Sequence, residues 1–447
     1  MKIAILGYGV EGQAAYEYWA ADNDITICDR SSDIAVPSGV ATRLGEHYLA
    51  DLDQFDVIVR SPNIHPRQID EANSPDILVK VTSNTNEFLR VCPTANIIGV
   101  TGTKGKGTTS TLIATMLQAA GKRVHLGGNI GVATLELLKA DIQPADYVVL
   151  ELSSFQLIDL HKSPRIAVCL MVVPEHMDWH EDFEEYVAAK QQLFIHQTAE
   201  DTAIYFAGNE DSLSIADASE GQLIPYFEQP GACVIDERIV IDGHEICKTS
   251  ELKLLGSHNW QNVCAAVTAV WQVSQDTAAL RSVLTSFSGL PYRLEFVREL
   301  NGVKYYNDSF GTTPETAIVA LQAFAEPKVI ILGGSTKGAD FTALAGAIAK
   351  CHVRQVIIMG NTANPDHRSD SSTIEAALRA ANVTDITSLI TAGGPTTEQV
   401  VQAAQGAAQP GDVVVLSAGC ASFDMYRDYK DRGSQFTEAV RALALLA

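Results

Sequence analysis

The chain has 447 residues, of which 46% are hydrophobic and 19% charged. This is too long for one hydrophobic core, and the composition is that of a folded protein, so several globular domains are expected. The formal net charge of −22 excludes a broad nucleic-acid or anionic-membrane surface, because clustered lysines and arginines bind phosphate groups. We therefore expect the protein to bind neither nucleic acid nor membranes.

The eight cysteines form no CxxC pair and mostly lie in apolar runs, which predicts reduced core residues. The first six residues run into a glycine turn, without the hydrophobic region of a signal peptide. The longest apolar run, residues 166–173, is too short to cross a bilayer. These features predict a cytoplasmic enzyme, and nothing in the sequence requires more than a monomer.

The first ninety residues begin with a nucleotide-binding pattern. Strand 3–6, Gly7-Tyr-Gly-Val-Glu-Gly12, a helix over 13–21 and strand 25–29 ending in Asp29 match the dinucleotide fingerprint. The same kind of turn can bind any phosphate at a helix N-terminus. The ligand of this turn could therefore be NAD or a nucleotide diphosphate held near Arg30. Further strands over 55–59 and 77–81 complete a small α/β domain.

A second glycine-rich turn follows an apolar strand over 95–100 and precedes a helix over 106–120. Gly102 and Gly105 would let backbone N–H groups face a triphosphate, and Lys106 would place a charge at its β- and γ-phosphates. The spacing differs from the common G-x-x-x-x-G-K-[ST], since Gly107 follows the lysine. An ordinary surface turn is the alternative interpretation.

Polar residues follow the next two strands. The strand over 146–151 ends in Glu151, a carboxylate suited to Mg²⁺, and the strand over 166–173 precedes Glu175-His176-Met-Asp178, suited to a second divalent ion. Carboxyl ends of parallel strands share one edge of a sheet. Lys190, on an otherwise apolar face of a helix over 183–196, is by pattern alone a structural lysine. Asn259 and Asn262, three residues apart on a helix, suit either an adenine edge or capping.

A linker near residues 289–295 leads to strands over 303–307, 328–332, 353–359 and 412–416, with helical patterns between them. This alternation predicts a doubly wound parallel sheet with polar residues at its carboxyl edge. We expect three α/β domains, at 1–92, 93–289 and 290–447.

Several motifs occur in a family-specific order: Thr101-Gly-Thr-Lys-Gly-Lys106, Glu151-Leu-Ser-Ser-Phe-Gln156, Glu175-His-Met-Asp178, Leu290-Pro-Tyr-Arg293, Asn307-Asp308-Ser309 and Ser417-Ala-Gly-Cys-Ala-Ser422. With them, essentially the whole chain resembles the Mur ligases of peptidoglycan synthesis, and the short first domain resembles those that add D-glutamate. The resemblance implies a Rossmann-like UDP-binding domain, a central P-loop ATPase-like domain and a C-terminal Rossmann-like domain. It also implies a role in cell-wall synthesis and cell division.

The resemblance implies an ATP-dependent ligase that joins D-glutamate to UDP-N-acetylmuramoyl-L-alanine through an acyl phosphate, releasing ADP and phosphate. Its implied cofactors are ATP and two Mg²⁺ ions, one at Thr108 and Glu151 and one at His176 and a carbamylated Lys190. Its implied catalytic residues are Lys106, Glu151, His176 and Lys190.

The remaining implied contacts fall into three groups. ATP would be bound by Gly102, Thr103, Lys104, Gly105, Lys106, Gly107, Thr108, Thr109, Asn259, Asn262, Arg293 and Asp308. UDP-N-acetylmuramoyl-L-alanine would contact Val10, Glu11, Asp29, Arg30, Ser61 and Asn129. Glutamate would contact Thr312, Lys337, Ser422 and Tyr429.

Two residues depart from the family pattern. Gly107 stands where the family usually has Ser or Thr, so Thr108 would have to supply the hydroxyl, and Phe310 stands where it commonly has Lys. The missing charge at Phe310 leaves open an L-glutamate-adding ligase. The alternatives from other classes are an NAD-dependent oxidoreductase, favoured by the first glycine turn, and a non-catalytic nucleotide-binding scaffold.

Overall fold

The computed structural model describes residues 1–254, 256, 258–336, 338–364, 367 and 369–444. The chain forms two compact units, one of Met1–Leu252 and Ser257–Phe287 and the other of Lys253–Gly256 and Ser288–Ala447. No helix among the described residues is long and apolar enough to cross a membrane. The large sheets of both units are mostly parallel, and their buried strands are rich in Ile and Val, as expected when helices cover both faces.

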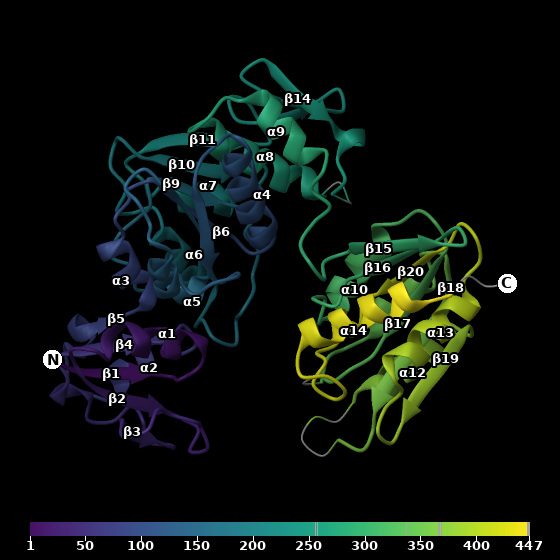
Figure 1. Cartoon of the computed structure of the whole chain (residues 1–447), viewed down its shortest axis with the longest axis horizontal. Helices are drawn as coiled ribbons and strands as arrows, with labels where there is room; N and C mark the ends of the chain where they lie inside the picture. The colour runs from purple at the N-terminus through teal and green to yellow at the C-terminus, as the bar shows by residue number, and fades with distance from the viewer. Residues whose placement is uncertain (255, 257, 337, 365–366, 368, 445–447) are drawn as a thin grey trace. The chain divides into compact units, whose positions relative to one another are not determined.

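The first sheet has five parallel strands in the order β3-β2-β1-β4-β5 (Figure 1). Its strands are β1 (Lys2–Leu6), β2 (Asp24–Asp29), β3 (Ala41–Leu44), β4 (Val57–Arg60) and β5 (Val81–Thr82). Its helices are α1 (Val10–Trp19), α2 (Pro66–Glu71) and α3 (Asn84–Val91), with 3-10 turns η1 (Leu52–Gln54) and η2 (Ile77–Lys80). The strand expected over 77–81 was therefore largely wrong. Asp76 has a left-handed backbone and Val79 is exposed, so this apolar run forms a 3-10 turn before a two-residue strand.

The second sheet has six parallel strands in the order β11-β10-β9-β6-β8-β7. They are β6 (Ile97–Thr101), β7 (Val124–Gly128), β8 (Tyr147–Glu151), β9 (Ile166–Cys169), β10 (Thr202–Phe206) and β11 (Gln222–Tyr226). The helical segments are α4 (Lys106–Ala119), η3 (Thr134–Ala140), α5 (Ser154–Leu157), α6 (Phe183–Gln191), α7 (Glu210–Ala216), α8 (His258–Trp271) and α9 (Thr277–Leu284). A small antiparallel sheet of β12 (Cys233–Ile235), β13 (Arg238–Ile241) and β14 (His244–Lys248) and the turn η4 (Thr249–Glu251) precede α8.

The first two sheets share a hydrophobic core. Ile3, Ile5 and Trp19 belong to the same buried cluster as Leu135 and Leu150 of the following segment. The expected domain boundary at residue 92 falls between the two sheets but inside one compact unit, and it stays a prediction.

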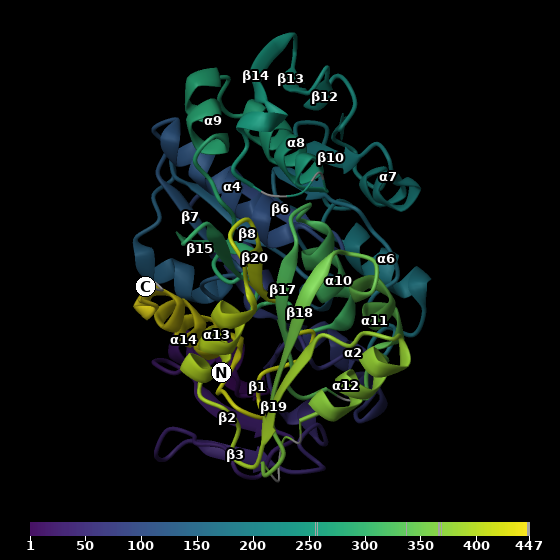
Figure 2. The same cartoon turned by 90° about the vertical axis from the view of Figure 1, so that its right-hand side faces the viewer.

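The second unit contains a six-stranded sheet in the order β15-β16-β20-β17-β18-β19. The strands are β15 (Glu295–Leu300), β16 (Val303–Asn307), β17 (Lys328–Leu332), β18 (Val353–Asn361), β19 (Ile386–Thr391) and β20 (Val413–Leu416). The helices are α10 (Pro314–Gln322), α11 (Thr342–Ile348), α12 (Ser371–Ala380), α13 (Thr397–Ala407) and α14 (Tyr429–Ala442). Figure 2 shows α13 and α14 on one side of this sheet and α10, α11 and α12 on the other.

Alternate residues of β17 point into these two cores, Val329 and Ile331 into one and Ile330 and Leu332 into the other. This arrangement confirms the doubly wound α/β fold expected for the C-terminal part. The edge strand β15 was not expected. It pairs antiparallel to β16 and is only partly buried, and its charged residues hide the alternation that would mark a strand.

Candidate active site

The glycine-rich loop between β6 and α4 has the backbone that a phosphate-binding loop requires. Gly102 has φ 139° and Gly105, the residue that caps α4, has φ 91°. A Cβ on Gly102 would lie 2.7 Å from the Cβ of Leu170, because Thr103 N–H donates to Met171 O and holds the loop against the segment after β9. Only glycine fits both the left-handed conformation and the close approach.

Lys106 is the first residue of α4, and its side chain turns back over this loop. Its Nζ donates to the carbonyl oxygens of Gly102 and Thr103, both at 3.0 Å. The ammonium group therefore lies beside the first turn of the helix, where the helix dipole already favours an anion.

Glu151 and Asn129 meet at the carboxyl edge of the second sheet. The register pairs Val100 with Glu151 and Thr101 with Cys169, so the ends of β8, β6 and β9 lie level. Glu151 is 5% exposed, and its Oε1 accepts a 2.9 Å hydrogen bond from Asn129 Nδ2. The carboxylate is thus held in one orientation at the edge from which the glycine-rich loop leaves.

Lys190 reaches the same loop from α6. Its side chain is almost fully buried, its Nζ donates to Gly102 O at 3.1 Å, and it lies 4.3 Å from the centre of the Tyr186 ring. Burial lowers the pKa of Lys190 to about 7, and the charge of Lys106 acts in the same direction. Lys190, which by sequence pattern alone is a structural lysine, therefore lies buried against the loop. Its amine loses its proton more readily than that of an ordinary lysine.

His176 lies near these two lysines, on the segment after β9. It has a left-handed backbone with φ 61°, which is unusual for a residue other than glycine and is often found at functional sites. Burial lowers the pKa of its imidazole, and the positive charges of Lys106 and Lys190 lower it further against the opposing effect of Glu175. Nearly half of the side chain is exposed, so a ligand can still approach it.

Two asparagines of α8 complete this side of the loop. A Cβ on Gly105 would lie 2.1 Å from Asn262 Oδ1, which places the amide directly against the loop. Asn262 Nδ2 donates to Asn259 Oδ1 at 2.8 Å, so the expected i, i+3 pair is present. Lys104, exposed at the tip of the loop, pairs with Glu175.

The residues expected to contact the UDP-sugar lie around the first sheet, and several already tie the protein together. Asp29 Oδ2 accepts the Tyr8 N–H at 2.7 Å, and Ser61 Oγ donates to Gly7 O at 3.0 Å, so both hold the first glycine turn. Glu11 accepts hydrogen bonds from Asn84 and from Gln156 of the segment after β8, and burial raises its pKa.

Two further expected contacts are open to solvent. Val10 is exposed at the start of α1. Arg30 is exposed and lines a cleft of about 480 Å³ together with Tyr48 and Gln68.

In the second unit, Asp308 follows β16 and is buried. Its Oδ2 accepts from Ser417 Oγ at 2.7 Å and its Oδ1 from Leu294 N at 3.2 Å, while burial raises its pKa to about 6. Arg293, whose charge acts on Asp308, stacks on Phe310 with 3.8 Å between the guanidinium carbon and the ring centre.

The residues expected to contact glutamate lie in the same unit. Thr312 is half-buried ahead of α10, and Tyr429 is the first residue of α14. Ser422 is buried, and its hydroxyl has no hydrogen-bond partner among the described residues. Lys337 lies outside the described residues.

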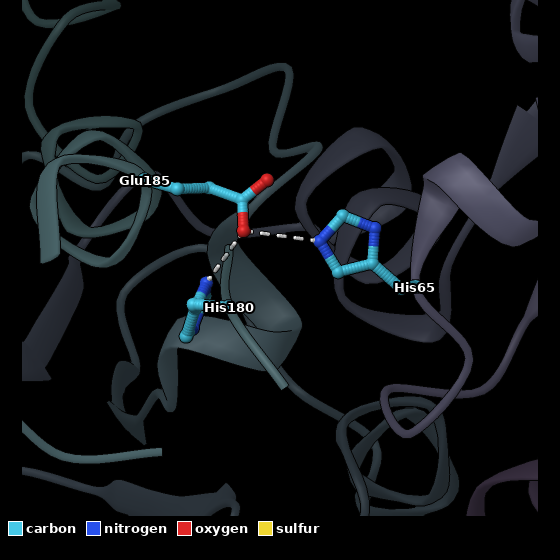
Figure 3. Close-up of side chains that lie close together, drawn as sticks. All are labelled: His65, His180 and Glu185. Carbon is cyan, nitrogen blue, oxygen red and sulfur yellow. Dashed lines mark hydrogen bonds and ion pairs between the residues drawn. The ribbon is translucent and has the colours of Figure 1, made fainter. Parts of the chain in front are cut away.

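The sequence did not reveal a cluster of His65, His180 and Glu185 (Figure 3). Glu185 Oε2 lies 3.3 Å from His65 Nε2 and 3.4 Å from His180 Nδ1, which joins the loop before α2 to α6. Although two imidazoles and a carboxylate can bind a metal, the Arg67 N–H donates to His65 Nδ1, so the ring proton is on Nε2 and faces Glu185.

A metal on His65 Nε2 would have to displace that proton, because it binds the lone pair of an unprotonated nitrogen. Arg67 also pairs with the other oxygen of Glu185. The cluster is therefore a hydrogen-bonded contact between the first two sheets. His65 and Glu185 are far apart in the sequence, and no spacing rule links them.

Comparison with known proteins agrees with this geometry. Residues 100–270 match the Mur ligase middle domain, and residues 292–420 match the Mur ligase glutamate ligase domain. The chain is 36% identical to a UDP-N-acetylmuramoylalanine--D-glutamate ligase of Acetivibrio thermocellus, an alignment that covers 99% of this chain and 96% of the relative.

Solved structures show the same fold at lower identity. The UDP-N-acetylmuramate-alanine ligase MurC of Thermotoga maritima aligns with a TM-score of 0.58 at 15% identity, over 99% of both chains. The MurF ligase of Thermotoga maritima, solved in complex with ADP, aligns with a TM-score of 0.58 at 16% identity, over 99% of this chain and 95% of the other. On the sequence matches, the chain belongs to the Mur ligase family of ATP-dependent ligases that form amide bonds.

Proposed function

We propose that this enzyme joins D-glutamate to UDP-N-acetylmuramoyl-L-alanine with hydrolysis of ATP to ADP and phosphate, in peptidoglycan precursor synthesis. The observation that carries the proposal is the phosphate loop with Lys106, Lys190 and Glu151 at one edge of the second sheet, together with a similarity to D-glutamate-adding relatives along the whole chain. The NAD-dependent oxidoreductase is not favoured, because the relative that aligns along the whole chain is a ligase and both matching family models are Mur ligase domains.

The reaction explains why cations gather at the loop. An oxygen of the substrate carboxylate attacks the γ-phosphorus of ATP, the bond to ADP breaks, and an acyl phosphate results. The glutamate amine then attacks the acyl carbon, phosphate leaves, and the amine loses a proton. Lys106 and the loop N–H groups would hold the phosphate oxygens and offset the repulsion between the two anions that must meet.

Thr108 and Glu151 offer oxygen atoms, the ligands that Mg²⁺ prefers, and His176 offers an imidazole nitrogen. We propose that Thr108 and Glu151 hold one ion, and that His176 and a carbamate on Lys190 hold a second. Glu151 is already oriented by Asn129, as a metal ligand needs to be. Bound Mg²⁺ would supply positive charge to the phosphate oxygens.

The lowered pKa of Lys190 supports its carbamylation. The neutral amine, which predominates above about pH 7, can add to CO2 with formation of an N–C bond and release of a proton. In protein equilibrated with 13C-bicarbonate, NMR should show one carbamate carbon that disappears in Lys190→Arg and persists in Lys122→Arg, a change at an exposed lysine. A spectrum without that signal in the unchanged protein would contradict this part of the proposal.

The other expected contacts are proposed in the same roles. The UDP-sugar would meet Val10, Glu11, Asp29, Arg30, Ser61 and Asn129. Nucleotide would meet the loop residues 102–109 with Asn259, Asn262, Arg293 and Asp308, and glutamate would meet Thr312, Lys337, Ser422 and Tyr429. The buried hydroxyl of Ser422 supports the last group, because a buried polar group without a partner is costly unless a ligand satisfies it. We also propose that the enzyme acts as a monomer.

Phosphate release measured with ATP, UDP-N-acetylmuramoyl-L-alanine and either glutamate enantiomer tests the function. We expect release that requires both substrates and proceeds with D-glutamate. Release with L-glutamate but not with D-glutamate would support the L-glutamate-adding ligase. Absence of release with either enantiomer would support the non-catalytic nucleotide-binding scaffold. Lys106→Ala should abolish turnover without loss of the circular dichroism spectrum, while Lys122→Ala should have no effect.

A further inference from the structure

The segment that carries Arg293 is held in an unusual conformation. Tyr292 and Leu294, on either side of Arg293, have φ values of 63° and 44°, in the left-handed region that non-glycine residues seldom occupy. Arg293 N–H donates to Leu290 O at 3.1 Å, and the Tyr292 N–H donates to Glu295 at 2.9 Å. The backbone around Arg293 therefore has one defined shape, which fixes where its side chain starts.

Two hydrogen bonds fasten this segment to the turn after β16. The Phe310 N–H donates to Tyr292 O at 2.9 Å, and the Leu294 N–H donates to Asp308 Oδ1 at 3.2 Å. The two bonds bring residue 310 alongside residue 293, at the open end of the antiparallel pair β15–β16. The side chain at position 310 is thus placed to meet the arginine.

The ring of Phe310 supports the guanidinium of Arg293. A distance of 3.8 Å between the guanidinium carbon and the ring centre is van der Waals contact with the ring face, the geometry of a cation–π interaction. Phe310 is itself positioned by Tyr429, whose ring meets it edge to face at 5.0 Å. Phe310 is 39% exposed, so it is not simply a core residue of the sheet.

We propose that Phe310 is a positioning residue that restricts the Arg293 guanidinium to one orientation on its ring face and thereby strengthens the binding of nucleotide by Arg293. The inference rests on the proposed function, in which Arg293 contacts nucleotide. A long arginine side chain at the surface samples many rotamers, and ordering it on binding costs affinity. The ring of Phe310 restricts the guanidinium before nucleotide binds and so lowers this cost. At position 310, where the family commonly has Lys, this chain thus has a residue that orients the positive charge of Arg293.

The test compares two variants of the whole enzyme. Phe310→Leu keeps an apolar side chain but removes the ring face, and we expect the Kd for a non-hydrolysable ATP analogue to rise about 3- to 10-fold. Phe310→Tyr keeps the face and should bind within 2-fold of the unchanged protein. The melting temperature should hardly change, because Phe310 is partly exposed and the effect acts through Arg293.

A double-mutant cycle separates this role from a general disturbance. In an Arg293→Ala background, Phe310→Leu should no longer change the Kd, because its partner is gone. An unchanged Kd in Phe310→Leu alone, or an equal rise in both backgrounds, would overturn the inference. Equilibrium binding does not depend on turnover, so the two proposals can fail separately. Absence of phosphate release would contradict the proposed function, whereas the role of Phe310 is tested by the Kd comparison alone.

Discussion

Residue 107, directly after Lys106, is glycine and has no hydroxyl that could bind Mg²⁺. A hydroxyl ligand must therefore come from another residue of the first turn of α4. Thr108 is the next residue and is buried there. Thr108→Val removes the hydroxyl and keeps the shape, and we expect the Mg²⁺ concentration for half-maximal phosphate release to rise about 10-fold. Thr111→Val is the matched control, since that hydroxyl has no hydrogen-bond partner among the described residues. Equal Mg²⁺ dependence in both variants would remove Thr108 from the proposed site.

The buried carboxyl of Asp308 predicts a pH dependence of stability. Burial raises its pKa from 3.8 to about 6, so between these values the folded state holds a proton that the unfolded state has released. The free energy of unfolding should therefore fall as the pH rises from 3.8 to 6, by about 1–3 kcal/mol, and remain lower above pH 6.

Asp308→Asn should abolish this pH dependence, because the amide carries no charge at any of these pH values. Hydrogen-exchange mass spectrometry of peptides from β16 at pH 5 and pH 8 would measure it. The opening free energy of the variant should exceed that of the unchanged protein by more at pH 8 than at pH 5. A difference that is the same at both pH values would show that Asp308 is not neutral at pH 5 in the folded protein.

Single residues differ in how far the sequence could predict them. Glu151 and Gly105 follow from local rules, because a strand end and a helix start each demand a particular residue type. The burial of Lys190 could not be inferred, since its partner Gly102 comes from a distant loop. The contact between Arg293 and Phe310 depends on two hydrogen bonds between their segments, one to the Tyr292 carbonyl and one to the Asp308 side chain, and no spacing in the sequence predicts it.

At the level of elements, the start of α4 gives a test of the proposed phosphate-binding loop. Gly105 and Gly121 stand on either side of this helix and both have positive φ values, 91° and 77°. A Cβ on Gly105 would clash with Asn262 Oδ1, whereas a Cβ on Gly121 would meet no atom within 4 Å. Gly105→Ala should therefore weaken ATP binding at least 10-fold, while Gly121→Ala should cost about 1 kcal/mol of stability and leave ATP binding unchanged.

Isothermal titration calorimetry with ATP and thermal unfolding of both variants would check this pair. Loss of ATP binding in Gly121→Ala as well would indicate general damage to α4 rather than a local effect at the loop.

The buried parallel strands of both units were the elements most accessible to sequence reasoning, because continuous runs of Ile, Val and Leu mark them. The elements that were wrong or missed lie at edges. β15 is half-exposed and charged, and the run over 77–81 is apolar but partly solvent-facing, so in each case hydrophobicity and burial do not coincide. Packing against the rest of the sheet decides such segments, and the sequence pattern does not carry that information.

For the whole molecule, the two compact units differ in how independent their parts are. The second unit has its own cores on both faces of one sheet, formed from residues of the same unit. The first sheet instead shares a core with the segment that follows it, through Ile3, Ile5 and Trp19. It is further joined there by Arg60, which is fully buried and pairs with Asp159 at 2.7 Å. The first sheet therefore has a core of its own on one face, around Leu6 and Ile58, and shares the core on its other face with the following segment.

This difference predicts how fragments of the chain behave. A fragment of residues 288–447 should fold alone and melt cooperatively. Residues 1–92 alone should not, because one face of their sheet would be exposed and the Arg60 charge would be left without Asp159.

All four tryptophans, Trp19, Trp179, Trp260 and Trp271, lie in the first unit. Tryptophan fluorescence of the whole chain should then follow only one of two calorimetric transitions, and the other should match the melting of fragment 288–447. A cooperative transition in fragment 1–92, or a single transition seen equally by both methods, would show that the shared core does not govern how the molecule unfolds.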